Sequence, residues 1–119
     1  MQTRNLRKIW SDQWDKKKIF YKIYLENGAI LKSPVYYHIS NDSKIGDVVV
    51  SDRGSKGVYF NGNSLTRIGK GIHVFRTKKS AIKYWPGRSV FKVLCKKEDL
   101  VGADKNKAAF MKVKIIEKV

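Results

Sequence analysis

Hydrophobic and polar positions alternate in two long stretches of the second half of the chain. Residues 90–97 place Phe91, Val93 and Cys95 on one side, and residues 110–119 repeat the pattern around Val113 and Ile115. A period of two indicates strands with one buried and one solvent-facing side. If the strands are neighbours, their outward lysines form one plate, made of Lys92, Lys96, Lys112 and Lys114. Two ordinary edge strands protected by lysine would show the same pattern.

Shorter apolar segments predict further strands upstream. Residues 19–25 alternate in the same way, and Asn27-Gly28 then predicts a type I′ hairpin turn into a second strand over residues 30–39. Residues 48–50 predict a short buried strand, and residues 72–75 a central one. Residues 97–101 predict a single turn, and residues 102–107 a polar loop before the last strand.

Helical spacing occurs in two places. Residues 4–16 form an amphipathic pattern, which predicts that residues 1–18 are a helical arm that docks on the body. Thr77 can cap a second helix over residues 78–85 that ends at Pro86-Gly87. That helix is expected to turn Ala81, Ile82 and Trp85 inward and Lys78, Lys79 and Lys83 outward. The expected fold class is therefore α+β, with a mostly antiparallel sheet.

The length of 119 residues fits a single domain over residues 1–119. The chain has one cysteine, Cys95, which excludes an intramolecular disulfide and fits a reducing compartment. No stretch is apolar enough for a membrane span, and the basic first 18 residues lack the apolar core of a secretory signal. A cytoplasmic protein, in the cytosol of a host cell, is the simplest interpretation.

Charge is the most informative total, because 26 basic residues stand against 10 acidic ones, for a net charge of +16. Residues 1–18 contribute +4, residues 19–60 only +1, and residues 61–119 contribute +11. Such a surplus attracts polyanions strongly, with nucleic acid or an acidic protein face as the expected partner. A solubility device, or the codon habit of an AT-rich genome, would give the same totals.

The residues expected to contact the polyanion are the lysine plate, the helix lysines and Arg88. Lysine-rich surfaces favour contact with the phosphate backbone over base readout, so sequence-specific recognition is not expected. In full, the candidate binding residues are Lys78, Lys79, Lys83, Arg88, Lys92, Lys96, Lys112 and Lys114.

Other site chemistry has weak signals in the sequence. His38, His73 and Cys95 lack metal-ligand spacing, and Cys95 falls at an inward strand position typical of inert packing. The basic turn at residues 53–57 could touch phosphate through its amides, although plain turn chemistry also explains it. We therefore expect no catalytic residue, metal or cofactor.

From Gly71 onward, the chain resembles a class of small, functionally uncharacterised accessory proteins of phages and prophages. The resembling segments are GIHVF, EDLV and the closing strand, together with YKIYLENG at residues 21–28. The resemblance implies origin and architecture more than activity. With the charge, it suggests a non-enzymatic accessory protein that binds nucleic acid, a nucleoprotein or an acidic host factor to modulate host machinery. A structural virion or scaffold component is an alternative.

A second resemblance concerns enzyme status. YYHIS, KIGD and GVYF, at residues 36–40, 44–47 and 57–60, are similar to the opening of small ADP-ribosyltransferases of the rifampicin-modifying type. It implies that His38 would face the ribose of NAD and that Tyr59 would stack on nicotinamide. The chain departs from the family pattern at Ile39 and Ser40, and its late acidic residue has no clear match among Glu98, Asp99 and Glu117.

Overall fold

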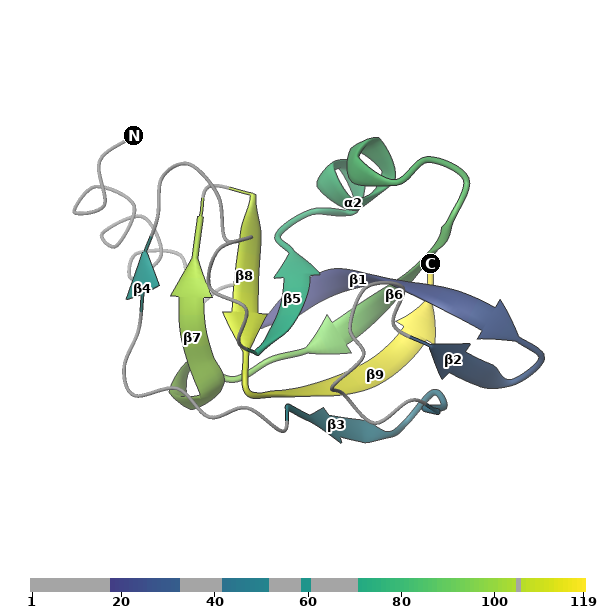
Figure 1. The fold of residues 1–119 in the computed structure, drawn as a ribbon, viewed down its shortest axis with the longest axis horizontal. Coiled ribbons are helices and arrows are strands. Elements are labelled where there is room, and N and C mark those ends of the chain that lie inside the picture. The colour runs from purple at the N-terminus through teal and green to yellow at the C-terminus, as the bar shows by residue number, and fades with distance from the viewer. Residues whose placement is uncertain (1–17, 33–41, 52–58, 61–70, 105) are drawn as a thin grey trace.

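The computed structural model of the chain describes residues 18–32, 42–51, 59–60, 71–104 and 106–119, which form a nine-stranded sheet and one short α-helix (Figure 1). The strands are β1 (Ile19–Asn27), β2 (Ile30–Lys32), β3 (Val48–Val50), β4 (Tyr59–Phe60), β5 (Ile72–Phe75), β6 (Ser89–Leu94), β7 (Leu100–Ala103), β8 (Lys107–Phe110) and β9 (Lys112–Lys118). The helix is α2 (Lys78–Tyr84), and a 3₁₀ turn, η1, covers Lys97–Asp99.

Neighbouring strands follow the order β3-β9-β6-β1-β5-β8-β7-β4, with β2 paired to the end of β1. The described pairs are antiparallel except β4 with β7. The expected contact between the two lysine-bearing strands exists, because β6 pairs directly with β9. A bulge between Lys92 and Val93 shifts the register, so that Lys92 lies opposite Glu117 and Leu94 opposite Lys114.

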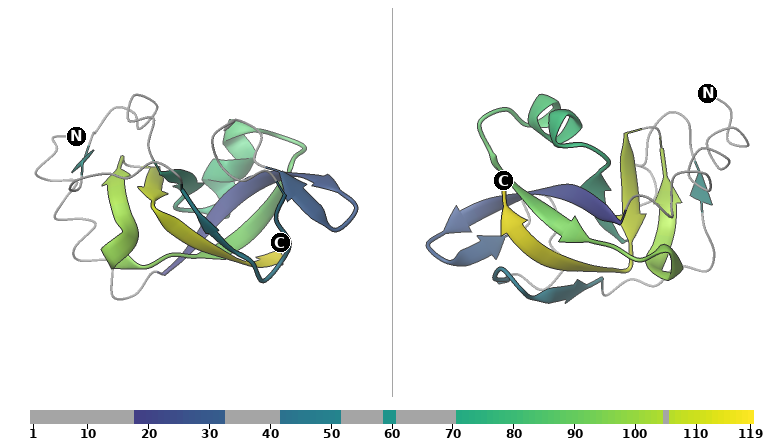
Figure 2. Two further views of the ribbon diagram at one scale, coloured as in Figure 1. Left: turned by 60° about the horizontal axis from the view of Figure 1, so that its bottom comes forward. Right: turned by 180° about the vertical axis from the view of Figure 1, so that it is seen from behind.

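The sheet curves strongly, and β5, β8 and β7 turn upward from the plane of β1, β6 and β9 (Figures 1 and 2). The main core fills one side of it and includes Phe20, Phe91, Phe110 and Ile115. A smaller cluster on the other side joins Ile23, Phe75 and Val90 to Ala81 of α2. β1 therefore buries side chains on both of its faces.

The predicted α+β class is wrong, because the described residues are nearly all β. Their helical content is the seven-residue α2 and the three-residue η1. The segment predicted to be polar loop contains the end of β7 and the start of β8, whose small residues Gly102, Ala103 and Ala108 are buried between neighbouring strands. The predicted N-terminal helix over residues 4–16 lies outside the described residues.

Two local predictions about the first strands need correction. The β1–β2 hairpin has Gly28 and Ala29 as its central residues, since Asn27 pairs with Ile30. Only Gly28 has a positive φ, 61°, which fits a type II′ turn in place of the predicted type I′. In β3, which was expected to be buried, Val49 is buried but Val48 and Val50 are more than half exposed.

Local signals position α2 directly after β5. The side-chain oxygen of Thr77 accepts a hydrogen bond from the backbone N–H of Ser80 at 3.0 Å, as the sequence predicted for an N-cap. Ala81 is fully buried, whereas Ile82, also predicted to face inward, is 44% exposed. Within the described residues, no helix has the length and apolar character needed to cross a membrane.

Gly71 allows β5 to begin close to β8. Its φ is +75°, and a Cβ atom there would lie 3.2 Å from the backbone oxygen of Phe110. Both the backbone conformation and the narrow gap require glycine at this position.

Candidate nucleic-acid interface

Hydrogen bonds to the β7–β8 connection and the pairing of β5 with β8 bring α2 and β8 together. The buried carboxylate of Asp104 accepts hydrogen bonds from the backbone N–H groups of Asn106 and Lys107, each at 2.7 Å. This orders the β7–β8 connection and fixes the first residue of β8. Lys107 then pairs with Phe75 across the β5–β8 ladder, directly below the start of α2.

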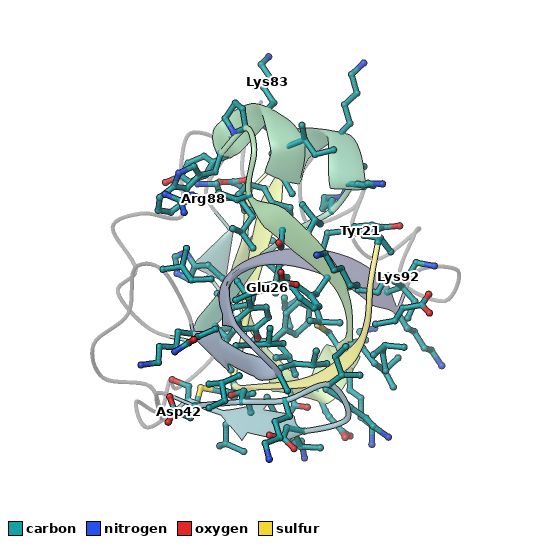
Figure 3. The ribbon with its side chains drawn as sticks, turned by 90° about the vertical axis from the view of Figure 1, so that its right-hand side faces the viewer. Tyr21, Glu26, Asp42, Lys83, Arg88 and Lys92 are labelled. Carbon is teal, nitrogen blue, oxygen red and sulfur yellow. The ribbon has the colours of Figure 1, made fainter. Side chains whose placement is uncertain are left out.

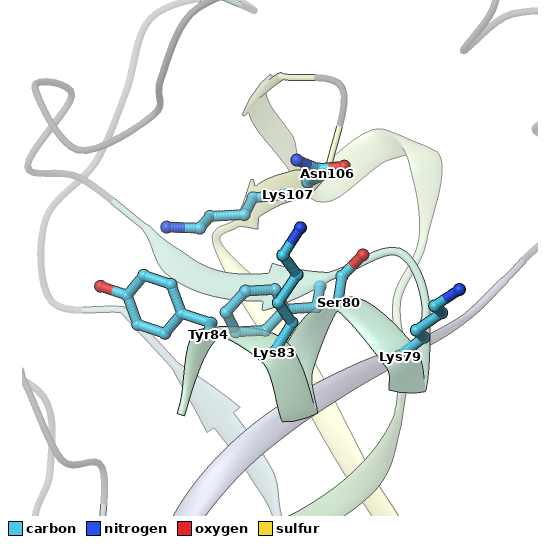
Figure 4. Close-up of a pocket in the computed structure, with 7 residues that line it drawn as sticks. Lys79, Ser80, Lys83, Tyr84, Asn106 and Lys107 are labelled. Carbon is cyan, nitrogen blue, oxygen red and sulfur yellow. The ribbon is translucent and has the colours of Figure 1, made fainter. Parts of the chain in front are cut away.

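The result is a surface hollow of about 550 Å³ between α2 and the beginning of β8 (Figure 4). Pockets of this size accept nucleotide-sized groups. Its side chains are mostly cationic or aromatic, and none is a carboxylate. We call it the α2 hollow; it is lined by Phe75, Lys79, Ser80, Lys83, Tyr84, Asn106 and Lys107.

Aromatic rings form the floor of the α2 hollow beneath a cation. The Nζ of Lys107 lies 4.1 Å from the ring centroid of Tyr84 and 5.5 Å from that of Phe75. The two rings contact each other with centroids 5.2 Å apart, and Tyr84 remains 54% exposed. Partial burial lowers the pKa of Lys107, and the nearby Asp104 carboxylate opposes this shift. Lys107 is thus a cation held at the edge of an apolar surface.

Three surface lysines form ion pairs with carboxylates of the described residues, and the lysines of the α2 hollow are not among them. The ion pairs between described residues join Lys32 to Asp42, Lys92 to Glu117 and Lys118 to Glu26. Lys79, Lys83 and Lys107 take part in none of them. Their field is therefore available to an incoming anion.

A second group of predicted residues lies on another part of the sheet. Lys96, Lys112 and Lys114 line a smaller hollow of about 290 Å³, together with Val48, Leu94, Asp99 and Val113. In Figure 1 this region, around β3 and β9, is at the bottom of the molecule, whereas α2 is at the top. The predicted binding residues therefore divide between two surfaces.

The remaining predicted residues join neither hollow. Lys92 forms an ion pair with Glu117 at 3.2 Å, which removes it from the expected plate of four free lysines. Arg88 lies over the ring of Trp85, with its Cζ 5.2 Å from the ring centroid. Lys78 is exposed in the first turn of α2. In Figure 3, Lys83 projects from α2 away from the body, while Arg88 and Lys92 lie on other sides of the molecule.

Sequence reasoning missed Tyr84, Asn106 and Lys107. The signal available for Tyr84 was its place beside Lys83 at the end of a cationic helix. Lys107 lies far from both in the sequence, and the β5–β8 pairing that brings it to Tyr84 leaves no mark in the local pattern.

Lys22 was also missed as a special position, since the alternation of residues 19–25 indicated a strand without marking this lysine as buried. It is 5% exposed, and its Nζ donates a hydrogen bond to the backbone oxygen of His73 at 3.3 Å. Burial lowers the pKa of Lys22 from 10.5 to about 8, against an opposing effect of Cys95. Nearby, burial raises the pKa of Cys95, so the thiol is kept protonated and is not an activated nucleophile.

The structure describes few of the residues that the NAD hypothesis requires. His38 lies outside the described residues, and for Tyr59 the structure gives the backbone position in β4 alone. Of the late acidic candidates, Glu117 pairs with Lys92, and Glu98 and Asp99 lie in η1. Among the described residues, no three His, Cys, Asp or Glu side chains gather as metal ligands would.

Comparisons of the chain with protein-family models, with curated proteins and with solved structures found no match. The resemblances to phage proteins and to ADP-ribosyltransferases therefore stay predictions from the sequence.

Proposed function

We propose that the protein binds nucleic acid without catalysis, and that the α2 hollow is where it does so. The observation that carries the proposal is that Lys79, Lys83 and Lys107 line one hollow together with exposed aromatic surface, and that its described lining contains no carboxylate. Lys32, Lys92 and Lys118, by contrast, are paired with carboxylates of the protein itself.

The cations of the hollow suit a phosphate backbone. Each lysine that neutralises a phosphate releases condensed counterions, which gives affinity that falls steeply with salt. Lysine is a point charge on a flexible stem, so it contacts phosphate oxygens without selecting a base. The net charge of +11 over residues 61–119 adds a long-range attraction between this half of the chain and a nucleic acid.

Tyr84 favours a single strand over a duplex. Its exposed ring lies at one end of the hollow, beneath the Lys107 ammonium (Figure 4), and unpaired bases stack on such rings with little regard for sequence. When the Lys107 ammonium turns from the ring to a phosphate oxygen, the ring face that it covered becomes free for a base.

In the cell, such binding would act stoichiometrically. Together with the phage-type resemblance of residues 71–119, it is consistent with an accessory protein in the host cytoplasm that modulates host machinery by occupying nucleic acid or a nucleoprotein.

The test is a salt titration of binding to a fluorescein-labelled single-stranded oligonucleotide, measured by anisotropy. We expect the triple variant Lys79→Gln/Lys83→Gln/Lys107→Gln to bind roughly a hundredfold more weakly at low salt and to lower the slope of log K against log salt by about 2. The control is Lys96→Gln/Lys112→Gln/Lys114→Gln, which loses the same charge elsewhere and should change affinity by about threefold or less.

Lys107 contacts the rings of Phe75 and Tyr84, so its substitution could disturb the floor of the hollow. The double variant Lys79→Gln/Lys83→Gln leaves Lys107 in place and tests the loss of charge with the floor intact. Equal weakening by the two triple variants would contradict the proposal, since it would leave net charge as the sole cause. Binding by the wild type that does not change with salt would contradict it as well.

A further inference from the structure

The outer edge of β3 is open in the described sheet. β3 ends the strand order and pairs only with β9 among the described strands. Ser51 donates its backbone N–H to Met111, and Asp47 accepts from Ile115, so the odd-numbered residues of this segment face β9. In an antiparallel pair the alternate residues point the other way. The backbone groups of Val48 and Val50 therefore point away from the sheet.

The side chains of this edge are apolar and exposed. Val48 is 54% exposed and Val50 56% exposed, and they lie opposite Lys114 and Lys112 in the ladder. Leu94 of β6 lies opposite Lys114 on the next strand. We call the surface formed by these side chains and Lys96 the β3 edge surface: Val48, Val50, Leu94, Lys96, Lys112 and Lys114.

The lysines of the β3 edge surface have no ion pair among the described residues. Asp99 is the one carboxylate that lines the associated hollow, against Lys96, Lys112 and Lys114. Apolar side chains, cations without an ion pair and a backbone edge without a partner strand thus occur together in the part of the chain that the structure describes.

We infer that the β3 edge surface docks an acidic protein segment in extended conformation, which adds as a strand to β3. Strand addition gives affinity through backbone hydrogen bonds and selectivity through alternate side chains. Val48, Val50, Leu94, Lys112 and Lys114 share one face of the sheet, and every second residue of an added strand points to that face. A segment with both apolar and acidic residues at these every-second positions would place its apolar side chains on Val48, Val50 and Leu94. Its carboxylates would pair with Lys112 and Lys114.

The same observations argue against other occupants. Exposed valines offer a nucleic acid neither charge nor a stacking surface, and the described residues that line this hollow include no aromatic ring for base stacking. A second copy of the chain would bring another net charge of +16 to the interface, so self-association is opposed by repulsion. An acidic peptide complements charge, apolar surface and backbone together. The inference does not depend on the proposed function, since it uses different residues and a different partner.

The experiment uses the full chain and a fluorescein-labelled twelve-residue peptide in which Val and Glu alternate at every second position, with Ser between them, so that one face carries both apolar and acidic side chains. A block peptide of the same composition, with acidic and apolar residues separated, is the control. We expect the alternating peptide to bind at least about tenfold more tightly. Methylating the backbone nitrogens that would face β3 should remove most of that affinity, although all side chains remain. NMR should locate the largest amide shifts at Val48 and Val50.

Two protein variants assign the contacts. Lys112→Gln/Lys114→Gln should weaken peptide binding about tenfold. Val48→Thr/Val50→Thr, which keeps the β-branched shape, should weaken it about fivefold. Lys79→Gln/Lys83→Gln removes equal charge from the α2 hollow and should leave peptide binding within about twofold.

Several results would overturn the inference: equal affinity for the two peptides, insensitivity to backbone methylation, amide shifts away from β3, or dimerisation of the protein through β3 without peptide binding. If the wild-type protein did not bind the oligonucleotide, the proposed function would be refuted and this inference would be unaffected.

Discussion

The α2 hollow and the β3 edge surface each hold three lysines that form no ion pair with another described residue, yet they differ in what surrounds those lysines. Beside α2, the neighbours are the rings of Phe75 and Tyr84. Beside β3, they are exposed valines and a strand edge that pairs with no other described strand. Rings suit bases, whereas valines and backbone groups suit a peptide.

The difference teaches that net charge sets the sign of the partner and local neighbours set its class. The same side chain has a third role in the interior, where Lys22 contacts a backbone oxygen and lies 5.3 Å from the ring centroid of Tyr24. Substitutions are therefore expected to affect stability most at the buried lysine and binding most at the exposed surfaces.

The largest effect is expected for Lys22→Met. The lowering of the Lys22 pKa from 10.5 to about 8 corresponds to a penalty of about 3 kcal/mol for burying the charge. Below pH 8 the lysine is charged in both folded and unfolded states, so the penalty is fully present. Between pH 8 and 10.5 only the unfolded state holds the proton, so the folded wild type gains stability as pH rises. Lys22→Met should therefore be more stable by about 2–3 kcal/mol at pH 7, with a difference that shrinks toward pH 10.5.

Urea unfolding of wild type and variant at each pH measures this difference in the free energy of unfolding. Exposed Lys83→Met is the control and should change stability by less than about 0.5 kcal/mol. A Lys22→Met difference that stays constant over this pH range would contradict a desolvated lysine at position 22.

A smaller effect is expected for Tyr84, which separates the aromatic from the ionic part of the α2 hollow. Tyr84→Ala should weaken single-stranded oligonucleotide binding about tenfold, because one stacking contact is lost. The salt slope should be unchanged, since no phosphate contact is removed. Tyr84→Phe should retain the affinity. Anisotropy at several salt concentrations tests both, and a lower slope for Tyr84→Ala would show that the ring acts by positioning Lys107.

The smallest effect is expected for Glu117→Gln, which frees Lys92 on β6, the strand that also carries Leu94 of the β3 edge surface. The ion pair at 3.2 Å is exposed, so its loss should change the free energy of unfolding by less than about 1 kcal/mol. Acidic-peptide affinity should rise about twofold, and oligonucleotide affinity at the α2 hollow should not change. A larger gain for the oligonucleotide than for the peptide would contradict the assignment of partners to the two surfaces.

Strands with clear alternation were predictable from the sequence. The patterns around Phe91 and Val113 gave β6 and β9, and Thr77 gave the start of α2. The alternation could not reveal that β1 buries both faces, because the curvature that encloses Lys22 comes from strands distant in sequence. Nor could three consecutive valines reveal an edge strand, since the exposure of Val48 and Val50 depends on which neighbour β3 lacks.

The candidate site was predictable in part for the same reason. Lys79 and Lys83 share a helix, and their period exposes them together. Lys107 reaches Tyr84 only through the β5–β8 pairing, and its segment reads as polar loop. Lys92 was placed correctly on its strand, but the bulge that sets it opposite Glu117 is invisible in a pattern of apolar residues.

The narrow gap beside Gly71 has an evolutionary consequence. A side chain there would have to push the backbone of Phe110 away while adopting a left-handed conformation, so natural variation at this position is restricted as long as β5 and β8 stay in register. The surface lysines, by contrast, can be substituted during evolution with little effect on folding. Distant relatives should therefore be recognisable by an invariant glycine before the β5 strand sooner than by their charge.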